Sequence, residues 1–358
     1  MLYLLTFTFF SAFIVLSFCR TMAPKLGLMD KPNARKHHQG AVPLVGGIAI
    51  CTTVILSVAL FQLPIKHQSL FLTSIGTLTL LGAFDDKFDI CFKARLVIQT
   101  LLSVAMMYFG GLELSTLGNL FGLGDVELGG FAYVITVLAV IGAINAFNMV
   151  DGIDGLLGGL SVVTFGALAW LMSSNNHHTL SDICLLFISA VLPYILMNLG
   201  LIGRRRRVFM GDAGSMMIGF TVIWLLLSAS QDASEPLIRP ITALWLIALP
   251  LMDMAAIMIR RIRRGHSPFK PDREHLHHIC QRLGLSSRQT LLAICSLATL
   301  LTGFGIVGEV QQLPESFMFI SFIICFVVYT FCLSNIWKVT SFLRRKLSKN
   351  AALTFQKK

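Results

Sequence analysis

Long apolar runs separated by short polar segments fill most of the chain. A helix that crosses a bilayer needs about 20 predominantly apolar residues, because every backbone polar group must be bonded internally in the hydrocarbon. The runs predict an all-α fold, a polytopic integral membrane helical bundle with about eleven transmembrane helices. Their approximate bounds are 2–20, 41–62, 68–84, 96–111, 130–149, 156–173, 180–200, 215–230, 240–259, 289–308 and 316–335.

The same pattern predicts a single transmembrane domain over residues 1–335 and a basic cytoplasmic tail over residues 336–358. The first run lacks the charged leading segment and the small-residue cleavage site of a signal peptide. We therefore expect it to be retained as a span.

The 29 Lys and Arg residues fall almost entirely on one side when successive loops are placed on alternate sides of the membrane. Only Lys66 and Arg239 lie on the other side. Cytoplasmic loops are enriched in Lys and Arg, so we expect a periplasmic N-terminus and a cytoplasmic C-terminus. The net charge of +11 thus reflects topology, and no nucleic-acid partner is expected. A charged fraction of 13% and a mean hydropathy of +0.75 exclude most soluble classes.

Acidic residues on this basic face are not explained by topology, and they gather in a few distant loops. They are Asp30, Asp85, Asp86, Asp89, Asp151, Asp154, Asp212, Asp253, Asp272 and Glu274.

The pair Asp85-Asp86 ends the third run. Adjacent carboxylates at a membrane boundary repel each other and lose solvation unless a cation or a phosphate-bound metal lies beside them. The alternative is a solvated helix end. The other acidic loops favour the functional interpretation.

The stretch Asn148-Met-Val-Asp-Gly-Ile-Asp-Gly155 follows the fifth run. If this turn is helical, Asp151 and Asp154 share one face. The glycine after each Asp lets backbone N–H groups approach a ligand closely. The alternative is a glycine-rich hairpin between two spans.

The stretch Phe209-Met-Gly-Asp-Ala-Gly-Ser215 opens the eighth run. A carboxylate just before a helix N-terminus suits a metal-diphosphate site, because Asp212 would hold the metal and the free N–H groups would face the phosphates. The alternative is a simple helix cap.

The longest cytoplasmic loop carries His275-Leu-His-His278 beside Arg273. These side chains could donate hydrogen bonds to phosphate or carry protons near neutral pH. Zinc binding and no direct role are the alternatives; the carboxylates favour a harder cation than zinc.

Three further features concern packing and topology. Asp253 lies inside the ninth run, so it must face the bundle interior or pair with a base. Gly46 and Gly47 are expected to let helices pack closely. The run Arg204 to Arg207 is interpreted as a topology determinant, with binding of lipid phosphate as the minority interpretation.

Together these motifs indicate a site for Mg²⁺ and a diphosphate at the membrane surface, because Mg²⁺ is usually shared between carboxylates and substrate phosphates. Displacement at phosphorus needs positioning and charge neutralisation more than covalent chemistry from the protein. Such a site could join a soluble nucleotide-activated group to a lipid phosphate.

In this order and spacing, the motifs resemble those of the polyprenyl-phosphate N-acetylhexosamine-1-phosphate transferase superfamily over about residues 1–340. The resemblance implies transfer of GlcNAc-1-phosphate from UDP-GlcNAc to undecaprenyl phosphate, with Mg²⁺ or Mn²⁺ and release of UMP. The product would be the lipid primer for O-antigen or enterobacterial common antigen-type glycans. It also implies a bacterial inner membrane location, an active site on the cytoplasmic face and a homodimer.

The resemblance also implies roles for individual residues. Asp212 is similar to the metal ligand, with Asp86 as a second candidate, and Asp85 is similar to the carboxylate that deprotonates or orients the lipid phosphate, assisted by Asp86. The remaining candidates are Asn148, Asp151, Asn198, Phe209 and Arg273 for substrate binding, with Phe209 stacking on uracil, and Asp154, His275, His277 and His278 for catalysis.

Two alternatives remain open. The same chemistry could act on UDP-MurNAc-pentapeptide or UDP-GalNAc; Leu276, which interrupts the run of histidines, favours the GlcNAc branch. A secondary transporter for an anionic solute is disfavoured, because transporters place charged groups near the midplane and often show related halves, whereas here the acidic motifs lie at span ends and no repeat is visible.

Overall fold

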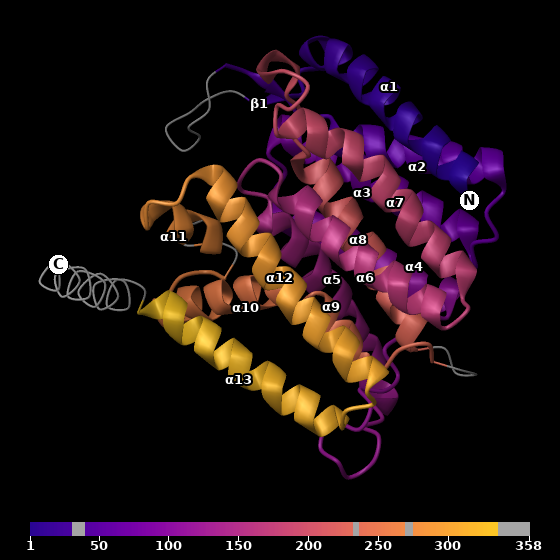
Figure 1. The fold of residues 1–358 in the computed structure, drawn as a ribbon, viewed down its shortest axis with the longest axis vertical. Coiled ribbons are helices and arrows are strands. Elements are labelled where there is room, and N and C mark those ends of the chain that lie inside the picture. Colours follow the sequence, from indigo (N-terminus) through magenta and orange to yellow (C-terminus); the bar gives the residue numbers. More distant parts are fainter. Residues whose placement is uncertain (31–39, 232–235, 269–274, 336–358) are drawn as a thin grey trace, which may run out of the picture.

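The computed structural model describes residues 1–30, 40–231, 236–268 and 275–335. The described part is a helical bundle (Figure 1), and the predicted all-α class is confirmed apart from one short hairpin. The helices are α1 (Leu2–Leu26), α2 (Gly46–Phe61), α3 (Gln68–Phe88), α4 (Phe92–Gly110), α5 (Ala132–Val150), α6 (Leu156–Ser174), α7 (His178–Asn198), α8 (Gly211–Ser230), α9 (Pro240–Leu246), α10 (Ala248–Arg263), α11 (Leu276–Arg282), α12 (Ser287–Val310) and α13 (Glu315–Ser334).

The hairpin and two single 3-10 turns complete the described secondary structure. β1 (Met29–Asp30) pairs antiparallel with β2 (Val42–Pro43), so that Met29 faces Pro43. The 3-10 turns are Gly129–Phe131 and Arg204–Arg206. The predicted tail over residues 336–358 lies outside the described residues.

Eight helices of the described chain are long and apolar enough to cross a membrane. A ninth span is formed if α9 and α10 are counted together, although they bend by 78° at their junction. α2 is apolar but has only 16 residues, and α3 ends on the charged sequence Asp85-Asp86-Lys87. The structure therefore supports a polytopic membrane protein, with each predicted run helical and one of them broken.

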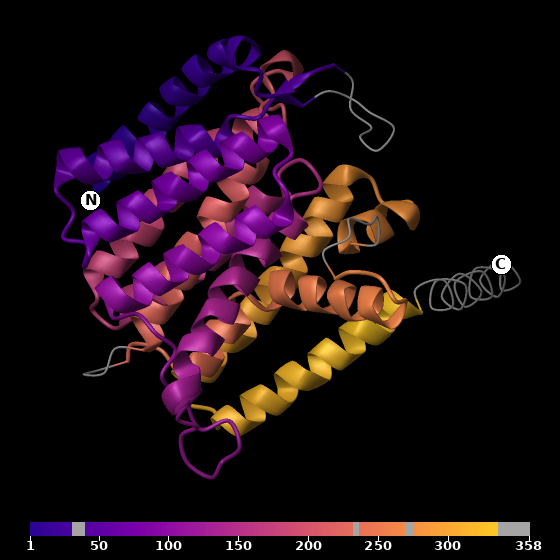
Figure 2. The ribbon, with the colours of Figure 1, turned by 180° about the vertical axis from the view of Figure 1, so that it is seen from behind.

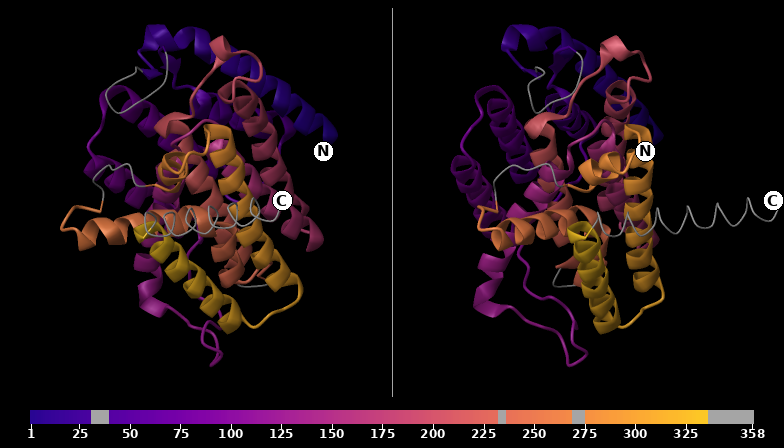
Figure 3. Two further views of the ribbon diagram at one scale, coloured as in Figure 1. Left: turned by 60° about the vertical axis from the view of Figure 1, so that its left-hand side comes forward. Right: turned by 90° about the vertical axis from the view of Figure 1, so that its left-hand side faces the viewer.

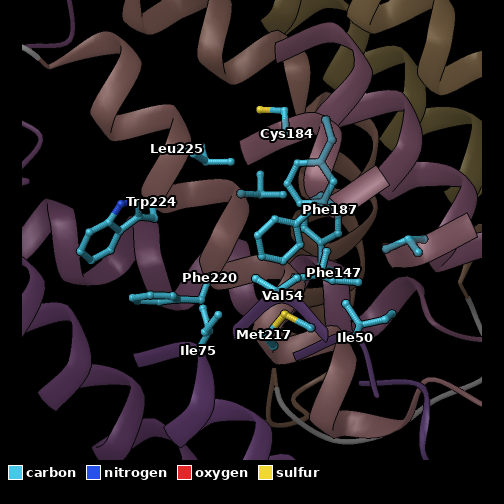
Figure 4. Close-up of a cluster of buried hydrophobic side chains, with 14 of the residues drawn as sticks. Ile50, Val54, Ile75, Phe147, Cys184, Phe187, Met217, Phe220, Trp224 and Leu225 are labelled. Carbon is cyan, nitrogen blue, oxygen red and sulfur yellow. The ribbon is translucent and has the colours of Figure 1, made fainter. Parts of the chain in front are cut away.

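The centre of the bundle is α8, whose apolar window is 94% buried. α3 and α5 pack on it most extensively, and α2 also contacts it. Seen from behind, α2 and α3 run side by side in front of α8 (Figure 2). Buried aromatic side chains from three helices lie in this part of the core (Figure 4), with Phe147 from α5, Phe187 from α7, and Phe220 and Trp224 from α8 itself. This packing fixes the position of the N-terminus of α8.

Close backbone packing holds the first turn of α8 between α2 and α3. A Cβ atom at Gly82 would lie 2.3 Å from the backbone nitrogen of Ala213, and one at Gly47 would lie 2.0 Å from that of Gly214. No side chain fits in either place, because a real Cβ does not approach another atom this closely. The predicted close packing at Gly47 is confirmed.

The C-terminal helices form the other side of the bundle. α10 crosses the direction of α12 and α13 (Figure 3), and it contacts α5, α12 and α13. Asp253 on α10 is 2% exposed and pairs with His275, with Nδ1 3.1 Å from Oδ2. The prediction that Asp253 faces the interior or pairs with a base is confirmed.

Candidate active site

The N-terminus of α8 is the point where the acidic segments meet. Asp86, near the end of α3, accepts hydrogen bonds from the backbone N–H groups of Asp212 (2.9 Å) and Ala213 (3.4 Å). These N–H groups have no partner within the helix, and the positive end of the helix dipole lies there. Asp86 therefore caps α8 from a neighbouring helix, with both carboxylate oxygens engaged.

Asp212 lies in the first turn of α8, inside the helix, whereas the sequence predicted it just before the helix. Its Oδ1 accepts a hydrogen bond from Asn148 Nδ2 at 2.7 Å, and the same amide nitrogen donates to Ser215 Oγ at 2.8 Å. The Asp212 side chain is 36% exposed. The hydrogen bond from Asn148 to Oδ1 thus orients the Asp212 carboxylate, and its Oδ2 takes no part in that bond.

Arg95, near the start of α4, lies between two carboxylates. Its Nη1 is 2.6 Å from Asp85 Oδ2 and 3.6 Å from Asp212 Oδ2. Asp85 is buried, and a buried carboxylate is costly unless it is paired. Arg95 supplies the compensating charge, and a guanidinium with five N–H donors can bind further oxygen atoms at the same time.

Residues 151–155 connect α5 to α6 without a helical turn. The two Asp side chains therefore do not share a helical face, and the helical turn considered from the sequence is absent. Asp154 Oδ2 lies 3.1 Å from Arg207 Nη1. Burial, followed by repulsion from Asp212 and Asp154, raises the pKa of Asp151 to about 7. Asp151 thus belongs electrostatically to the cluster at α8.

Asn198, a predicted substrate contact, is 2% exposed at the end of α7. Its Oδ1 accepts a hydrogen bond from the Gly155 N–H, and its Nδ2 donates to the Val208 carbonyl at 2.8 Å. In the structure this side chain therefore joins the Asp-Gly turn to the segment that leads into α8.

Phe209 lies in that segment, beside β2. Its backbone N–H donates to the Pro43 carbonyl at 2.8 Å, and its carbonyl accepts from the Gly46 N–H at 2.9 Å. Its side chain is partly buried. Arg273, the predicted phosphate contact, lies outside the described residues.

The histidine segment reaches the Asp-Gly turn from the C-terminal helices. A Cβ at Gly152 would lie 2.1 Å from His277 Nε2, so the imidazole packs directly against this glycine. Burial, with smaller contributions from His278 and His275, lowers the pKa of His277 to about 3. His277 is therefore uncharged at neutral pH. The structure brings this segment to the carboxylate cluster, although it is far away in the sequence.

The raised pKa of Asp151 predicts how stability depends on pH. We expect the Asp151→Asn variant of the metal-free protein to have a higher Tm than the wild type, by a difference that grows to a few degrees between pH 5 and pH 8. A carboxyl whose folded pKa is raised contributes stability below its unfolded pKa of about 3.9 and loses it as the pH rises through about 7. Asn does not ionise, so the Asp151→Asn variant does not lose this stability as the pH rises.

Thermal unfolding in detergent with a chelator measures this difference. Asp182→Asn on α7 is the matched control, because α7 reaches the site only through its other end, at Asn198. A Tm difference for Asp151→Asn that stays constant over this pH range would contradict the electrostatic coupling.

The residues of this cluster fit a divalent metal that also binds the phosphates of a substrate. Among the residues described, no three His, Cys, Asp or Glu side chains converge as a ligand set of their own. Mg²⁺ is usually held by one or two carboxylates and by substrate phosphates. Asp212, with a partly exposed carboxylate close to Asp85 and Asp151, has the chemistry of such a ligand.

Two pairings of basic residues at the site were not predicted from the sequence. Arg95 was counted only as a charge that sets topology, and Arg207 belonged to a run with lipid-phosphate binding as the minority interpretation; in the structure they pair with Asp85 and Asp154 respectively. Their position within basic loops gave no separate signal. A buried carboxylate at Asp85 needs a cation beside it, and this requirement could have pointed to a nearby basic residue such as Arg95.

Comparison with known proteins gives consistent matches. Residues 67–230 match glycosyl transferase family 4. Proteins named "Undecaprenyl-phosphate alpha-N-acetylglucosaminyl 1-phosphate transferase" are similar over nearly the whole chain. The relative from Escherichia coli (strain K12) is 49% identical over 93% of this chain and 90% of its own length. The relative from Yersinia pestis is 49% identical over 95% of this chain and 92% of its own.

The relative from Pasteurella multocida (strain Pm70), of the same name, is 46% identical over 96% of this chain and 97% of its own length. The enzymes of this family transfer phosphoglycosyl groups and generally depend on a divalent metal. Identity at this level over nearly the full length shows that the chain belongs to glycosyl transferase family 4, together with these undecaprenyl-phosphate α-N-acetylglucosaminyl 1-phosphate transferases.

Proposed function

We propose that this protein transfers GlcNAc-1-phosphate from UDP-GlcNAc to undecaprenyl phosphate and releases UMP. The observation that carries the proposal is the carboxylate cluster around the N-terminus of α8, with Arg95 between Asp85 and Asp212, in a chain whose relatives bear the name of this reaction. The product, undecaprenyl-diphosphate-GlcNAc, would be the primer for O-antigen or enterobacterial common antigen-type glycans.

The reaction joins two phosphates. An oxygen of the lipid phosphate attacks the phosphorus that carries GlcNAc, a new phosphoanhydride bond forms, and the old one breaks so that UMP leaves with its electron pair. Asp85 orients the lipid phosphate or accepts its proton, and Arg95 binds its oxygens. The protein contributes mainly position and charge compensation, as is usual for transfer at phosphorus.

Asn148, Asp151 and Phe209 would hold the nucleotide, with the Phe209 ring on the uracil, and Arg273 would contact phosphate. Asp212 would hold Mg²⁺ or Mn²⁺ with the diphosphate, and Asp86 would support it chiefly by capping α8. When bound, the cation neutralises developing charge on the phosphates. Asn198 and Asp154 would position the surrounding loops. The three histidines of the segment that packs on the Asp-Gly turn would lie beside the phosphates; they are His275, His277 and His278.

The membrane arrangement is also proposed. We propose eleven spans, with α9 and α10 as a broken one, and acidic motifs that lie on the cytoplasmic face of the bacterial inner membrane. The N-terminus then lies in the periplasm and the basic tail in the cytoplasm. One transmembrane catalytic domain covers residues 1–335, and we expect a homodimer.

Purified protein with Mg²⁺ and undecaprenyl phosphate should release UMP from UDP-GlcNAc. Equimolar UDP-GalNAc or UDP-MurNAc-pentapeptide should lower this rate by less than about twofold, since a donor of low affinity competes poorly. UMP release is measured by chromatography, and a reaction mixture without undecaprenyl phosphate is the control. Folded protein that releases no UMP, or that prefers another donor, would refute the assignment.

A further inference from the structure

Asp253 is a buried carboxylate that belongs to no part of the α8 cluster. Three donors from other segments converge on it. Its Oδ1 accepts from the Tyr329 hydroxyl at 2.6 Å and from the Leu276 N–H at 3.2 Å, and its Oδ2 lies 3.1 Å from His275 Nδ1. Asp253 on α10 thereby ties the start of α11 to α13.

From this anchor, a row of rings leads to the active site. The His275 and His277 rings stack with centroids 5.7 Å apart and planes 13° from parallel. His277 then packs against Gly152, the residue after Asp151. His277 Nε2 is buried and has no hydrogen-bond partner among the residues described. The His277 ring also lies beside the His278 ring, with centroids 4.2 Å apart. Of these two ring neighbours, His275 is the one that the structure links to Asp253.

The hydrogen bonds to Asp253 also bear on which ring nitrogen of His275 carries the proton of the neutral imidazole. An ionised carboxylate only accepts hydrogen bonds, and Tyr329 and Leu276 both donate to it. His275 Nδ1 must then carry a proton, so that in the neutral ring Nε2 has the free lone pair. A carboxylate that holds one imidazole tautomer in this way is a common support for functional histidines.

We propose that Asp253 and Tyr329 are positioning residues of the active site, which hold the histidine segment against the Asp-Gly turn and keep His275 in the tautomer protonated on Nδ1. The inference rests on the proposed transferase function and extends it to α10 and α13, both outside the residues that match the family. On this proposal, Asp253 and Tyr329, which both lie within the bundle, affect the transfer reaction through His275.

Asp253→Asn is the most informative variant. Asn keeps the shape but can donate a hydrogen bond to His275 Nδ1, which then favours the opposite tautomer. We expect kcat for UMP release to fall by about 10- to 100-fold. Tyr329→Phe keeps the carboxylate and the ring, and should lower kcat by about two- to tenfold. Asp182→Asn and Tyr108→Phe, both outside the site, are matched controls and should retain wild-type rates.

The double variant Asp253→Asn/His275→Gln separates positioning from a general structural effect. If Asp253 acts through His275, the double variant is no slower than the slower single variant. The ¹⁵N chemical shifts of the imidazoles report the tautomer directly, and the proton of His275 should move from Nδ1 to Nε2 in Asp253→Asn. If this variant does not fold, Tyr329→Phe combined with His275→Gln provides the same comparison.

Losses that multiply in the double variant, or a rate of Asp253→Asn within about twofold of wild type, would overturn the proposal. UMP release by the wild-type enzyme in the same experiment distinguishes a failure of the positioning role from a failure of the proposed transferase function. If the wild type turns over and these results appear, only the positioning role fails; if the wild type releases no UMP, the transferase assignment fails.

Discussion

Asp212→Asn should reduce UMP release by about 1000-fold or more while the protein remains folded. Asn keeps the size of the side chain and can still accept the hydrogen bond from Asn148. It loses the negative charge that would hold a divalent cation beside the diphosphate. Steady-state UMP release at saturating Mg²⁺ measures the effect.

The control for Asp212→Asn is Asp182→Asn on α7, which removes an equal charge away from the cluster. A Tm of the variant that is no lower than that of the wild type would establish that the fold is intact, because the α8 cap formed by Asp86 is untouched and the substitution removes repulsion between carboxylates. Activity of Asp212→Asn within tenfold of wild type would rule out the metal role.

Arg95→Ala should lower kcat/KM for undecaprenyl phosphate by about 100-fold or more. Arg95 is the cation between Asp85 and Asp212, so its removal leaves the buried Asp85 carboxylate unpaired and the incoming lipid phosphate facing uncompensated negative charge. The effect is measured by varying the lipid acceptor at saturating UDP-GlcNAc.

Lys93→Ala provides a matched control for Arg95→Ala, since Lys93 is an exposed basic residue two positions earlier on the same helix. It should keep a rate within about twofold of wild type. If both variants lose activity equally, the basic face acts through its overall charge and the specific role of Arg95 is wrong.

The apolar runs predicted the bundle well because hydrophobic length is a local property of the chain. The run at 240–259 was predicted as one continuous span, whereas α9 and α10 meet at a 78° bend. Pro250 lies in the first turn of α10, where its missing backbone N–H is tolerated, and a proline at this place is the sequence signal of the break. The sequence likewise left open whether residues 151–155 form a helical turn, which they do not.

The motifs identified the site segments, but most of their pairings depend on the tertiary fold. Asp86 was proposed as a catalytic and metal residue, and the structure adds that it caps α8 across 126 positions of sequence. Asp253 was expected to pair with a base, but Tyr329, 76 positions away, could not be foreseen. Such partners become visible only when helices far apart in the chain are packed together.

Binding of Mn²⁺ in the presence of UDP-GlcNAc tests most directly whether the cluster at the N-terminus of α8 is the metal-diphosphate site. Electron paramagnetic resonance can count free and bound Mn²⁺ without any turnover. We expect wild-type protein and Asp182→Asn to bind about one Mn²⁺ per chain, and Asp212→Asn to bind it at least tenfold more weakly, because carboxylates are preferred ligands of this ion. Equal Mn²⁺ affinity in wild type and Asp212→Asn would contradict the account.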